Sequence, residues 1–578
     1  LIRCTTMYGS STSGHIKGKL LKTPTAFFIF SFSILSLSWY LINSRLQIYL
    51  PLPIFWGSAI CVLLLIAYQI IKLDESSSQH FLILLQIMMF TSITRTIFVP
   101  DVAFYGYDPY HEVAATVVIS RNGWEPSATY PIFASGYGYP LIHFLAIIYS
   151  QTNGIELFTT AKWLPIVFSI PVTLILYQLS IKLVNSRRVG LLTALAFSTL
   201  YQSQMFHSLF LRESIAFVMF VTTIYVYYMA IYTRKKTYLY LAFVSSIASV
   251  FSHHLTPFLL MVFFLSTYIL QKLTTRTQIG KNKLSKELYR IFPVRSRAFS
   301  LIFILFFIVF LFSYWTHLHY SPLEIIATIL REAYFVIGGQ PAGIPLLRYW
   351  IMLWAEIAFA FIFGLLSVYG FCLRDNERTS LDVTSIAWAF LMGLFAVGFS
   401  MGRILPEGSF AMARRFQAFS YPFLFMLSGY VAHKKFKKPK RPEMLGIIVI
   451  SIFIGFSILQ LYSIPPYLYS DYEISYNQGE YRNILLPQEY RATIWSTPQG
   501  KVVIDWNVMA HVMRSARVLT PSLEVEAYDR ENAKTQGYTY FIARRVGPFL
   551  LTDAELHFLT ECNNEVYNNG VVEIYRRR

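Results

Sequence analysis

Two carboxylates and an imidazole stand together in one short polar stretch of this sequence. Residues 107–112 read Tyr-Asp-Pro-Tyr-His-Glu, so Asp108 and Glu112 flank His111 along the chain. Aspartate suits the position before a helix and proline suits its first turn, so we expect a short helix to begin here. On such a helix Asp108 and Glu112 lie four residues apart and share one face.

These residue types can take and give protons, which predicts acid–base chemistry at this stretch. We predict that Asp108 is a general base, with Glu112 or His111 as the neighbour that orients it. The ordinary alternative is that both acids cap and solvate a surface helix. An acid held at the surface of a bilayer is costly and usually functional, so the surrounding elements decide between the two interpretations.

The composition of the whole chain is that of a membrane protein. Its 578 residues are 55% hydrophobic, 17% aromatic and only 14% charged. The mean hydropathy is +0.47, far above that of soluble globular proteins. We therefore expect a polytopic α-helical protein of the cell membrane, with the lipid bilayer as its main partner.

Charge and cysteine content exclude other classes. The net charge of +18 could suggest nucleic acid, but the Lys and Arg residues fall in short connections between apolar runs, so we expect no nucleic-acid partner. The four cysteines, Cys4, Cys61, Cys372 and Cys562, show no metal or disulfide spacing.

The apolar runs predict about thirteen transmembrane helices, in an arrangement that sets the topology. The expected spans are 24–42, 50–71, 80–99, 157–184, 189–206, 214–232, 238–251, 257–270, 299–315, 348–373, 383–401, 416–432 and 444–463. Two further segments, 111–120 and 139–150, predict helices that lie on or dip into the outer leaflet, because the first is amphipathic and the second is too short to cross.

Three parts follow from this map. Residues 1–23 form a cytoplasmic tail, 24–463 the transmembrane domain, and 464–578 a small extracytoplasmic α/β domain. The basic loop 272–297 is the strongest cytoplasmic anchor, and it places the acidic loop 100–138 outside. In the last part we expect strands near 501–505 and 538–542 and helices at 508–515 and 553–562.

Further candidate residues gather on the same outer side. Glu213 follows Arg212 at the start of a span, where a simple ion pair at the membrane interface is the alternative to a functional role. His253 and His254 end another span, and for either one alone an interface histidine is the ordinary interpretation.

Three arginines oppose the general topology. Arg403, Arg414 and Arg415 are expected in an outer loop, although the rest of the chain keeps its basic clusters inside. The planar guanidinium suits phosphate, so a lipid phosphate or pyrophosphate is the natural partner. Binding of ordinary phospholipid, or pairing with Glu407, is the alternative.

This arrangement resembles the C-type glycosyltransferase superfamily, which uses polyprenyl-phosphate sugar donors, and in it the catalytic subunit of oligosaccharyltransferases. Residues 107–111 look like the acidic first outer loop of that subunit, and 212–217, Arg-Glu-Ser-Ile-Ala-Phe, look like its second. Residues 414–416, Arg-Arg-Phe, with Tyr-Pro at 421–422, are similar to its donor-phosphate segment. Residues 565–576 resemble the terminal strand of archaeal members.

The resemblance implies transfer of a sugar from a dolichyl-type donor to a glycan, lipid or protein acceptor, with inversion at the anomeric carbon. Asp108 would be the base, with Arg212, Arg403, Arg414, Arg415, His253 and His254 as substrate-binding residues. Asp108 and Glu213 could also hold Mg²⁺ or Mn²⁺, because oxygen ligands suit both ions.

Two other function classes stay open at this point. A lipid or anion transporter or flippase would also need outer arginines and buried acids, although it should show repeated halves. A membrane scaffold without catalysis would use the last part of the chain to bind a partner.

Overall fold

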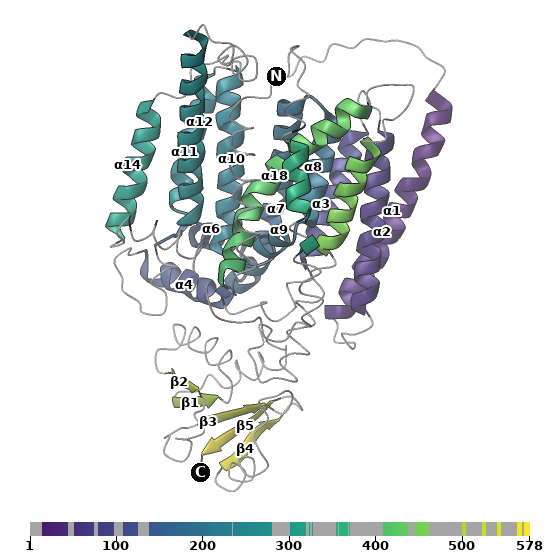
Figure 1. Cartoon of the computed structure of the whole chain (residues 1–578). Coiled ribbons are helices and arrows are strands. Elements are labelled where there is room, and N and C mark those ends of the chain that lie inside the picture. The colour runs from purple at the N-terminus through teal and green to yellow at the C-terminus, as the bar shows by residue number, and fades with distance from the viewer. Residues whose placement is uncertain are drawn as a thin grey trace.

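Apolar runs of roughly twenty residues form long helices, and the computed structural model shows how these pack into one bundle (Figure 1). The structure describes residues 14–43, 51–73, 79–96, 108–124, 138–233, 235–279, 301–318, 323, 326, 354–355, 358–367, 369, 408–436, 446–461, 500–504, 523–527, 540–544, 563–568 and 572–577.

The main helices cover the predicted runs, although α1 begins ten residues before position 24 and α12 extends nine residues beyond position 270. They are α1 (Gly14–Asn43), α2 (Pro51–Lys72), α3 (His80–Thr96), α4 (Asp108–Asn122), α6 (Leu141–Asn153), α7 (Leu157–Val184), α8 (Arg187–Thr199), α9 (Tyr201–Phe206), α10 (Arg212–Thr233), α11 (Lys236–Val250), α12 (Leu255–Ile279), α14 (Leu301–His317) and α18 (Gly408–Phe436). The short helices predicted at 111–120 and 139–150 are confirmed as α4 and α6.

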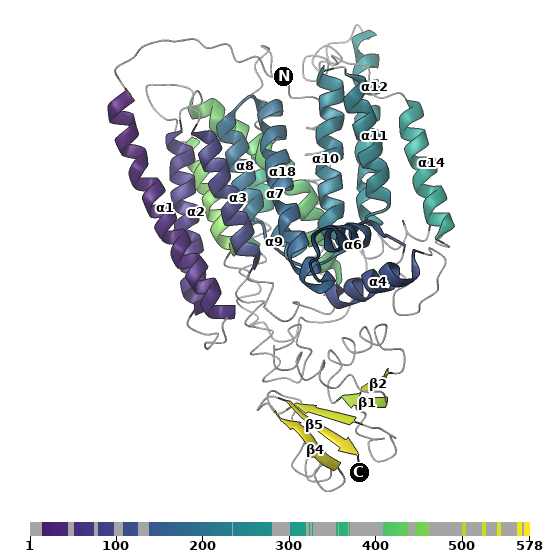
Figure 2. The same ribbon diagram turned by 180° about the vertical axis from the view of Figure 1, so that it is seen from behind.

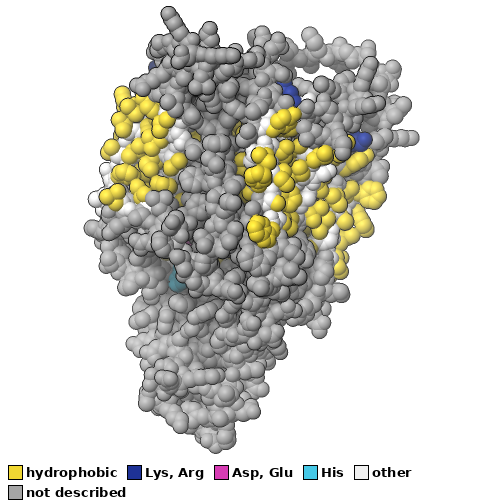
Figure 3. Space-filling model, in the orientation of Figure 1, with side chains coloured by type: hydrophobic (Ala, Val, Ile, Leu, Met, Phe, Trp, Pro, Cys, Tyr) yellow, Lys and Arg dark blue, Asp and Glu magenta, His cyan; other side chains and the backbone are white. Residues whose placement is uncertain are grey.

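Length and surface composition identify a helical membrane protein. Three helices of the described part are long and apolar enough to cross a membrane, namely Ile54–Lys72 in α2, Leu157–Val184 and Arg212–Ala230 in α10. Large apolar side chains face outward, for example Ile302 at 75% and Phe30 at 64% exposure. They form patches on the side of the bundle (Figure 3). The full count of thirteen spans stays a prediction, and the expected span 383–401 lies outside the described residues.

The helices stand side by side while two of them lie across one end. α10, α11, α12 and α14 gather at one side, and α1, α2 and α3 at the other (Figures 1 and 2). α7, α8 and α18 pack between these groups. α4 and α6 run across the end of the bundle that faces the strands (Figures 1 and 2).

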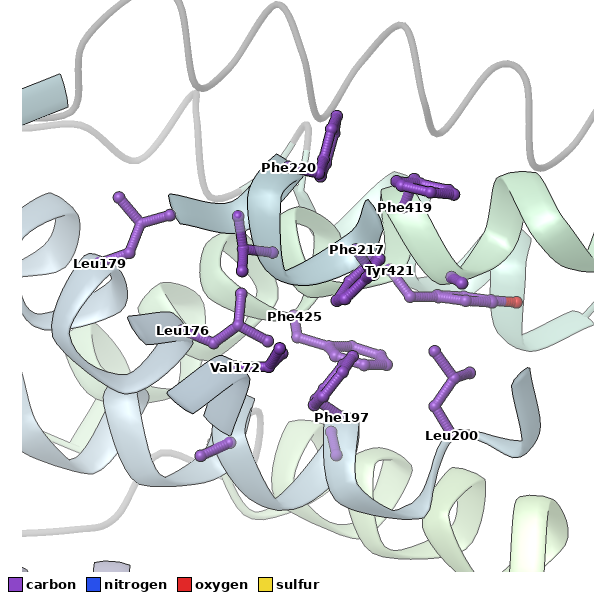
Figure 4. Close-up of a cluster of buried hydrophobic side chains, with 14 of the residues drawn as sticks. Val172, Leu176, Leu179, Phe197, Leu200, Phe217, Phe220, Phe419, Tyr421 and Phe425 are labelled. Atoms are coloured by element: carbon purple, nitrogen blue, oxygen red, sulfur yellow. The ribbon is translucent and has the colours of Figure 1, made fainter. Parts of the chain in front are cut away.

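Small residues let the central helices approach closely. A Cβ atom at Gly190 in α8 would come within 2.9 Å of Tyr177 in α7, and one at Gly429 in α18 within 2.9 Å of Val189. Such small contacts are typical of helix packing in membranes. Next to them Phe197 and Phe217 stack at 5.4 Å, and Phe419 adds an aromatic contact from α18 (Figure 4).

The single continuous helix predicted for 189–206 is wrong, because the helix breaks at Leu200 into α8 and α9. No Gly or Pro marks this break. Buried amides replace the lost helical hydrogen bonds, since the Gln204 side chain donates to the carbonyl of Ser198 and Gln460 accepts from the backbone N–H of Tyr201 at 3.0 Å.

The prediction of a loop around Arg414 and Arg415 is also wrong for the described residues. α18 begins at Gly408, so Arg414 lies in its second turn and Arg415 at the start of its third. The segment between Gly408 and Pro422 has no proline, and its alanines, methionine and arginines favour helix. The side chains of both arginines lie outside the described part of the structure.

Five strands form one mixed sheet. They are β1 (Gly500–Ile504), β2 (Leu523–Ala527), β3 (Tyr540–Arg544), β4 (Asn563–Asn568) and β5 (Val572–Arg577), in the order β2-β1-β3-β5-β4. β1 pairs in parallel with β2 and β3, whereas β5 runs antiparallel to β3 and β4.

The sheet tests part of the prediction for residues 464–578. The two predicted strands are present, shifted by one or two residues, while the predicted helices 508–515 and 553–562 lie outside the described residues. The expected single terminal strand is wrong, because β4 and β5 pair antiparallel. Asn569-Gly570, a pair typical of hairpin turns, separates them in the sequence.

Candidate active site

α4 is a largely buried helix that lies across the end of the bundle (Figures 1 and 2). Four of its apolar side chains form a small cluster that packs with Ile147 of α6, while Val113 belongs to the main core. The buried members are Ala114, Ala115, Val118 and Ile119. The polar residue that shares this buried side, Glu112, is only 6% exposed and needs partners.

Glu112 lies between two cationic side chains from other helices. Its Oε1 accepts a hydrogen bond from Nε of Arg212 at 2.8 Å, and its Oε2 lies 3.3 Å from Nε2 of His143. Burial raises the pKa of Glu112. Arg212, and then His143, lower it, and together they outweigh the effect of burial, so the pKa lies below its ordinary value. The ionised carboxylate therefore ties α4 to α10 and α6.

The hydrogen bonds of Thr116 decide where the proton of His143 lies. The Thr116 hydroxyl donates its one proton to the backbone carbonyl of Glu112 at 2.7 Å. Its 2.8 Å contact with Nδ1 of His143 then requires Nδ1 to be the donor. Nε2 faces a carboxylate, so a second ring proton is needed for attraction, and the arrangement fits an imidazolium.

A second acid and histidine pair lies beside the first. Glu213 follows Arg212 in α10, and its Oε1 lies 3.5 Å from Nε2 of His253. The backbone N–H of Leu255 donates to Nδ1 of His253 at 3.3 Å, which leaves the ring proton on Nε2. His253 can thus face Glu213 as a neutral donor, unlike His143.

Tyr139 joins the two pairs. The guanidinium of Arg212 lies 5.7 Å from the centre of its ring, within the range of a cation–π contact. The same ring lies about 6 Å from the rings of His253 and His254. The hydroxyl of Tyr314 donates to the carbonyl of Gly138, the residue before Tyr139, and this hydrogen bond helps to fix the position of Tyr139.

The structure brings several of the predicted site residues together. Glu112, Arg212, Glu213, His253 and His254 lie in one cluster built from α4, α10 and the turn before α12. The two histidine rings are 4.2 Å apart. Arg212 pairs with Glu112 and Glu213 pairs with His253, while the charge of Glu213 also acts on Arg212.

Other predicted residues remain untested by side-chain geometry. Asp108 is the first residue of α4, as predicted, and stands four residues before Glu112, but its side chain lies outside the described part. Arg403 lies outside the described residues altogether. His111 is half-buried in α4, whereas the histidine that pairs with Glu112 is His143.

Sequence reasoning missed His143, Thr116 and Tyr139. His143 is fully buried in α6 and sits in an apolar segment that was predicted only to lie on the membrane. A lone histidine in such a segment was its one signal. Thr116 carries no signal at all, because its function is to accept a hydrogen bond from a ring that arrives from another helix.

The described side chains of this cluster offer too few ligands for a divalent cation. The described residues contain no group of three or more His, Cys, Asp or Glu side chains that could hold a metal. Glu213 and His253 offer two donor atoms, and Glu112 is already neutralised by two cations. The described side chains therefore do not fit Mg²⁺ or Mn²⁺ by themselves.

The cluster fixes α4 at the end of the bundle, and the first turn of α4 carries Asp108. Paired carboxylates, a neutral histidine and aromatic rings are suited to binding hydroxyl groups and to moving a proton. The charges that fix α4 come from Arg212 and His143, so Asp108 at its start is not needed for them.

Comparisons with known proteins find similarity among solved structures. No protein-family model matches the chain, and no curated protein sequence matches it. Among solved structures, the chain is similar to the apo form of an oligosaccharyltransferase from Archaeoglobus fulgidus, with a TM-score of 0.47 and 13% identity over 82% of this chain and 70% of that one. No residue role is transferred at this level of similarity.

Proposed function

We propose that this chain is a membrane glycosyltransferase that takes a sugar from a polyprenyl-phosphate, dolichyl-type donor. The observation that carries the proposal is the ionic clamp on Glu112, made by Arg212 and His143. It holds α4 in place, and α4 begins with Asp108 at the end of a bundle of apolar helices. At this end of the bundle a donor anchored in the lipid can meet an acceptor in the aqueous phase.

In the proposed reaction Asp108 acts as the general base. It takes the proton of an acceptor hydroxyl or amide, whose heteroatom attacks the anomeric carbon of the sugar. The bond between that carbon and the phosphate oxygen breaks, and polyprenyl phosphate leaves with the electron pair. Direct displacement inverts the anomeric carbon, and the acceptor is a glycan, a lipid or a protein.

Cations are needed where negative charge develops on the leaving phosphate. We assign this function to Arg414 and Arg415, with Arg403 as a further candidate, because arginine matches the geometry of phosphate. Arg414 and Arg415 lie in the second and third turns of α18, which packs against α8 and α9. Glu213, His253 and His254 are assigned to binding the sugar or acceptor hydroxyls.

Asp108→Asn is the decisive test. Asparagine keeps the volume and capping ability of aspartate, so a structural Asp108 would tolerate the change at a cost within about 1 kcal/mol. A base would not, and transfer should fall about 10²- to 10⁴-fold. The assay follows radiolabelled sugar from polyprenyl-phosphate donor to acceptor in membranes, with Glu156→Gln, at an exposed position, as control.

Transfer at the unmodified rate by Asp108→Asn would refute the assignment of the base. If the unmodified protein leaves the donor pool unconsumed with every acceptor class, the proposed function is wrong. A lipid or anion transporter, or a scaffold, would then take its place.

A further inference from the structure

We propose that Arg95, His207 and Gln204 form a buried site for one phosphate-type oxyanion at the ends of α3 and α9. This site is separate from the Glu112 cluster, and it does not rest on the proposed glycosyltransferase function. Its evidence is a buried positive charge without a counter-charge, surrounded by polar atoms without partners.

Arg95 lies in the last turn of α3 and is fully buried. Its Nη1 donates to the carbonyl of Thr91 at 2.9 Å, and its Nη2 donates to the hydroxyl of Ser203 in α9 at 2.6 Å. Both acceptors are neutral, and Nε has no partner. No ion pair among the described residues involves Arg95.

Unpartnered polar atoms gather around this guanidinium. Ser203 and His207 lie four residues apart along α9 and the turn that follows it, and both ring nitrogens of fully buried His207 lack a hydrogen bond. Gln204 donates to Thr94 at 3.1 Å, whereas its Oε1 lacks a partner. Five unpartnered atoms thus come from two helices in contact, namely Arg95 Nε, Thr91 Oγ1, Gln204 Oε1, His207 Nδ1 and His207 Nε2.

Water alone would leave the charge uncompensated. A guanidinium stays protonated in proteins, and an unpaired buried charge costs several kcal/mol. Burial, and then the charge of Arg95, lower the pKa of His207 well below its ordinary value. The ring is therefore neutral, so it offers one donor and one acceptor, and the only positive charge of the cluster is that of Arg95.

The donors and acceptors select the kind of anion. Arg95 Nε and one nitrogen of His207 donate, while the other nitrogen of His207 and Gln204 Oε1 accept. Hydrogen phosphate, or a phosphate monoester that keeps one proton, matches both donors and one of the two acceptors, because it carries negative oxygens and a single O–H. Chloride and sulfate have no proton to give at neutral pH, so they would leave both acceptors unmatched.

The cluster lies at the ends of its two helices. Arg95 is one residue from the end of α3, and His207 directly follows α9. The rings of Phe197 and Phe217 lie 6.1 and 5.7 Å from that of His207, and both belong to the apolar cluster of Figure 4. The phosphate can belong to a free ion or to a polyprenyl phosphate, and the test separates these sources.

The test measures binding by the purified full-length chain in detergent and in lipid nanodiscs. Inorganic phosphate should raise the melting temperature in a saturable way, and equal concentrations of sulfate or chloride should not. A response to a short-chain polyprenyl phosphate alone would assign the lipid head group as the source. No response to either phosphate would overturn the proposal.

Two variants make the test specific. Arg95→Met removes the charge at similar length and should weaken phosphate binding at least about tenfold, whereas Arg121→Met, at an exposed position of α4, should leave it unchanged. Gln204→Glu places a carboxylate beside Arg95, so it should raise the melting temperature without phosphate and abolish the phosphate response. If both Arg95→Met and Gln204→Glu keep the full response, phosphate binds elsewhere and the proposal is wrong.

Discussion

Replacing Glu112 with glutamine tests the ionic clamp that holds α4. The change keeps the shape of the side chain and one hydrogen-bond acceptor for Arg212, but it removes the negative charge between two cations. The side chains of Arg212 and His143 are only 14% and 0% exposed, so solvent cannot replace that charge fully. Arg212 keeps its charge when Glu112 is replaced, because a guanidinium is not deprotonated in proteins.

The magnitude follows from these contacts. Breaking a buried ion pair costs about 3 to 5 kcal/mol, and the retained neutral hydrogen bond to Arg212 recovers about 1 kcal/mol. We therefore expect Glu112→Gln to lower the free energy of unfolding by about 2 to 4 kcal/mol. Unfolding in mixed detergent micelles measures this, with Glu156→Gln, at an exposed position, as the matched control.

The pH dependence gives a second readout with a definite sign. The folded-state pKa of Glu112 lies below its unfolded value, so its stabilisation is present above the unfolded pKa, about 4.3. It is lost as the pH falls through the folded-state pKa. The stability difference between the unmodified protein and Glu112→Gln should therefore shrink as the pH falls below about 4.3.

A double-mutant cycle completes this test. Arg212→Gln combined with Glu112→Gln should show a coupling energy of about 1 to 3 kcal/mol, because each single change leaves an uncompensated partner. The reasoning would be refuted if Glu112→Gln cost no more than the Glu156→Gln control. It would also be refuted if the two changes added without coupling.

Two further predictions concern the donor and the topology. Arg414→Ala with Arg415→Ala should weaken use of the lipid-phosphate donor by about 1.5 to 3 kcal/mol per lost contact, with partial rescue by lysine; an unchanged apparent donor affinity would make both arginines lipid anchors. Cysteines placed at Lys283 and Gln499 should label from opposite sides of sealed vesicles, and labelling from one side would discard the topology and the outer position of the site.

Apolar runs along the chain predict its helices well. α7 matches its predicted bounds, and α2, α3 and α10 begin within two residues of theirs. The reason is that a helix in lipid must satisfy its backbone hydrogen bonds internally over its whole length, so an apolar run marks the extent of the helix. The break at Leu200 escaped prediction, because Gln204 and Gln460 satisfy the exposed backbone groups only after the chain has folded.

The candidate site divides in the same way. Asp108, Glu112, Glu213 and the His253-His254 pair could be proposed from residue type and position near the ends of apolar runs. Their partners could not, because His143 lies 31 residues from Glu112, and Arg212 lies 100 residues away. Pairing over such separations depends on how α6 and α10 pack against α4, which local patterns do not encode.

The sequence by itself determined that this is a helical membrane protein, and it marked the acidic segment at 107–112 as the place for chemistry. Only the tertiary structure decided that Glu112 is neutralised by Arg212 and His143, while Arg95 is buried without a counter-charge. The physical reason is that hydropathy is a local sum over neighbouring residues. The compensation of a buried charge depends instead on which helices meet around it.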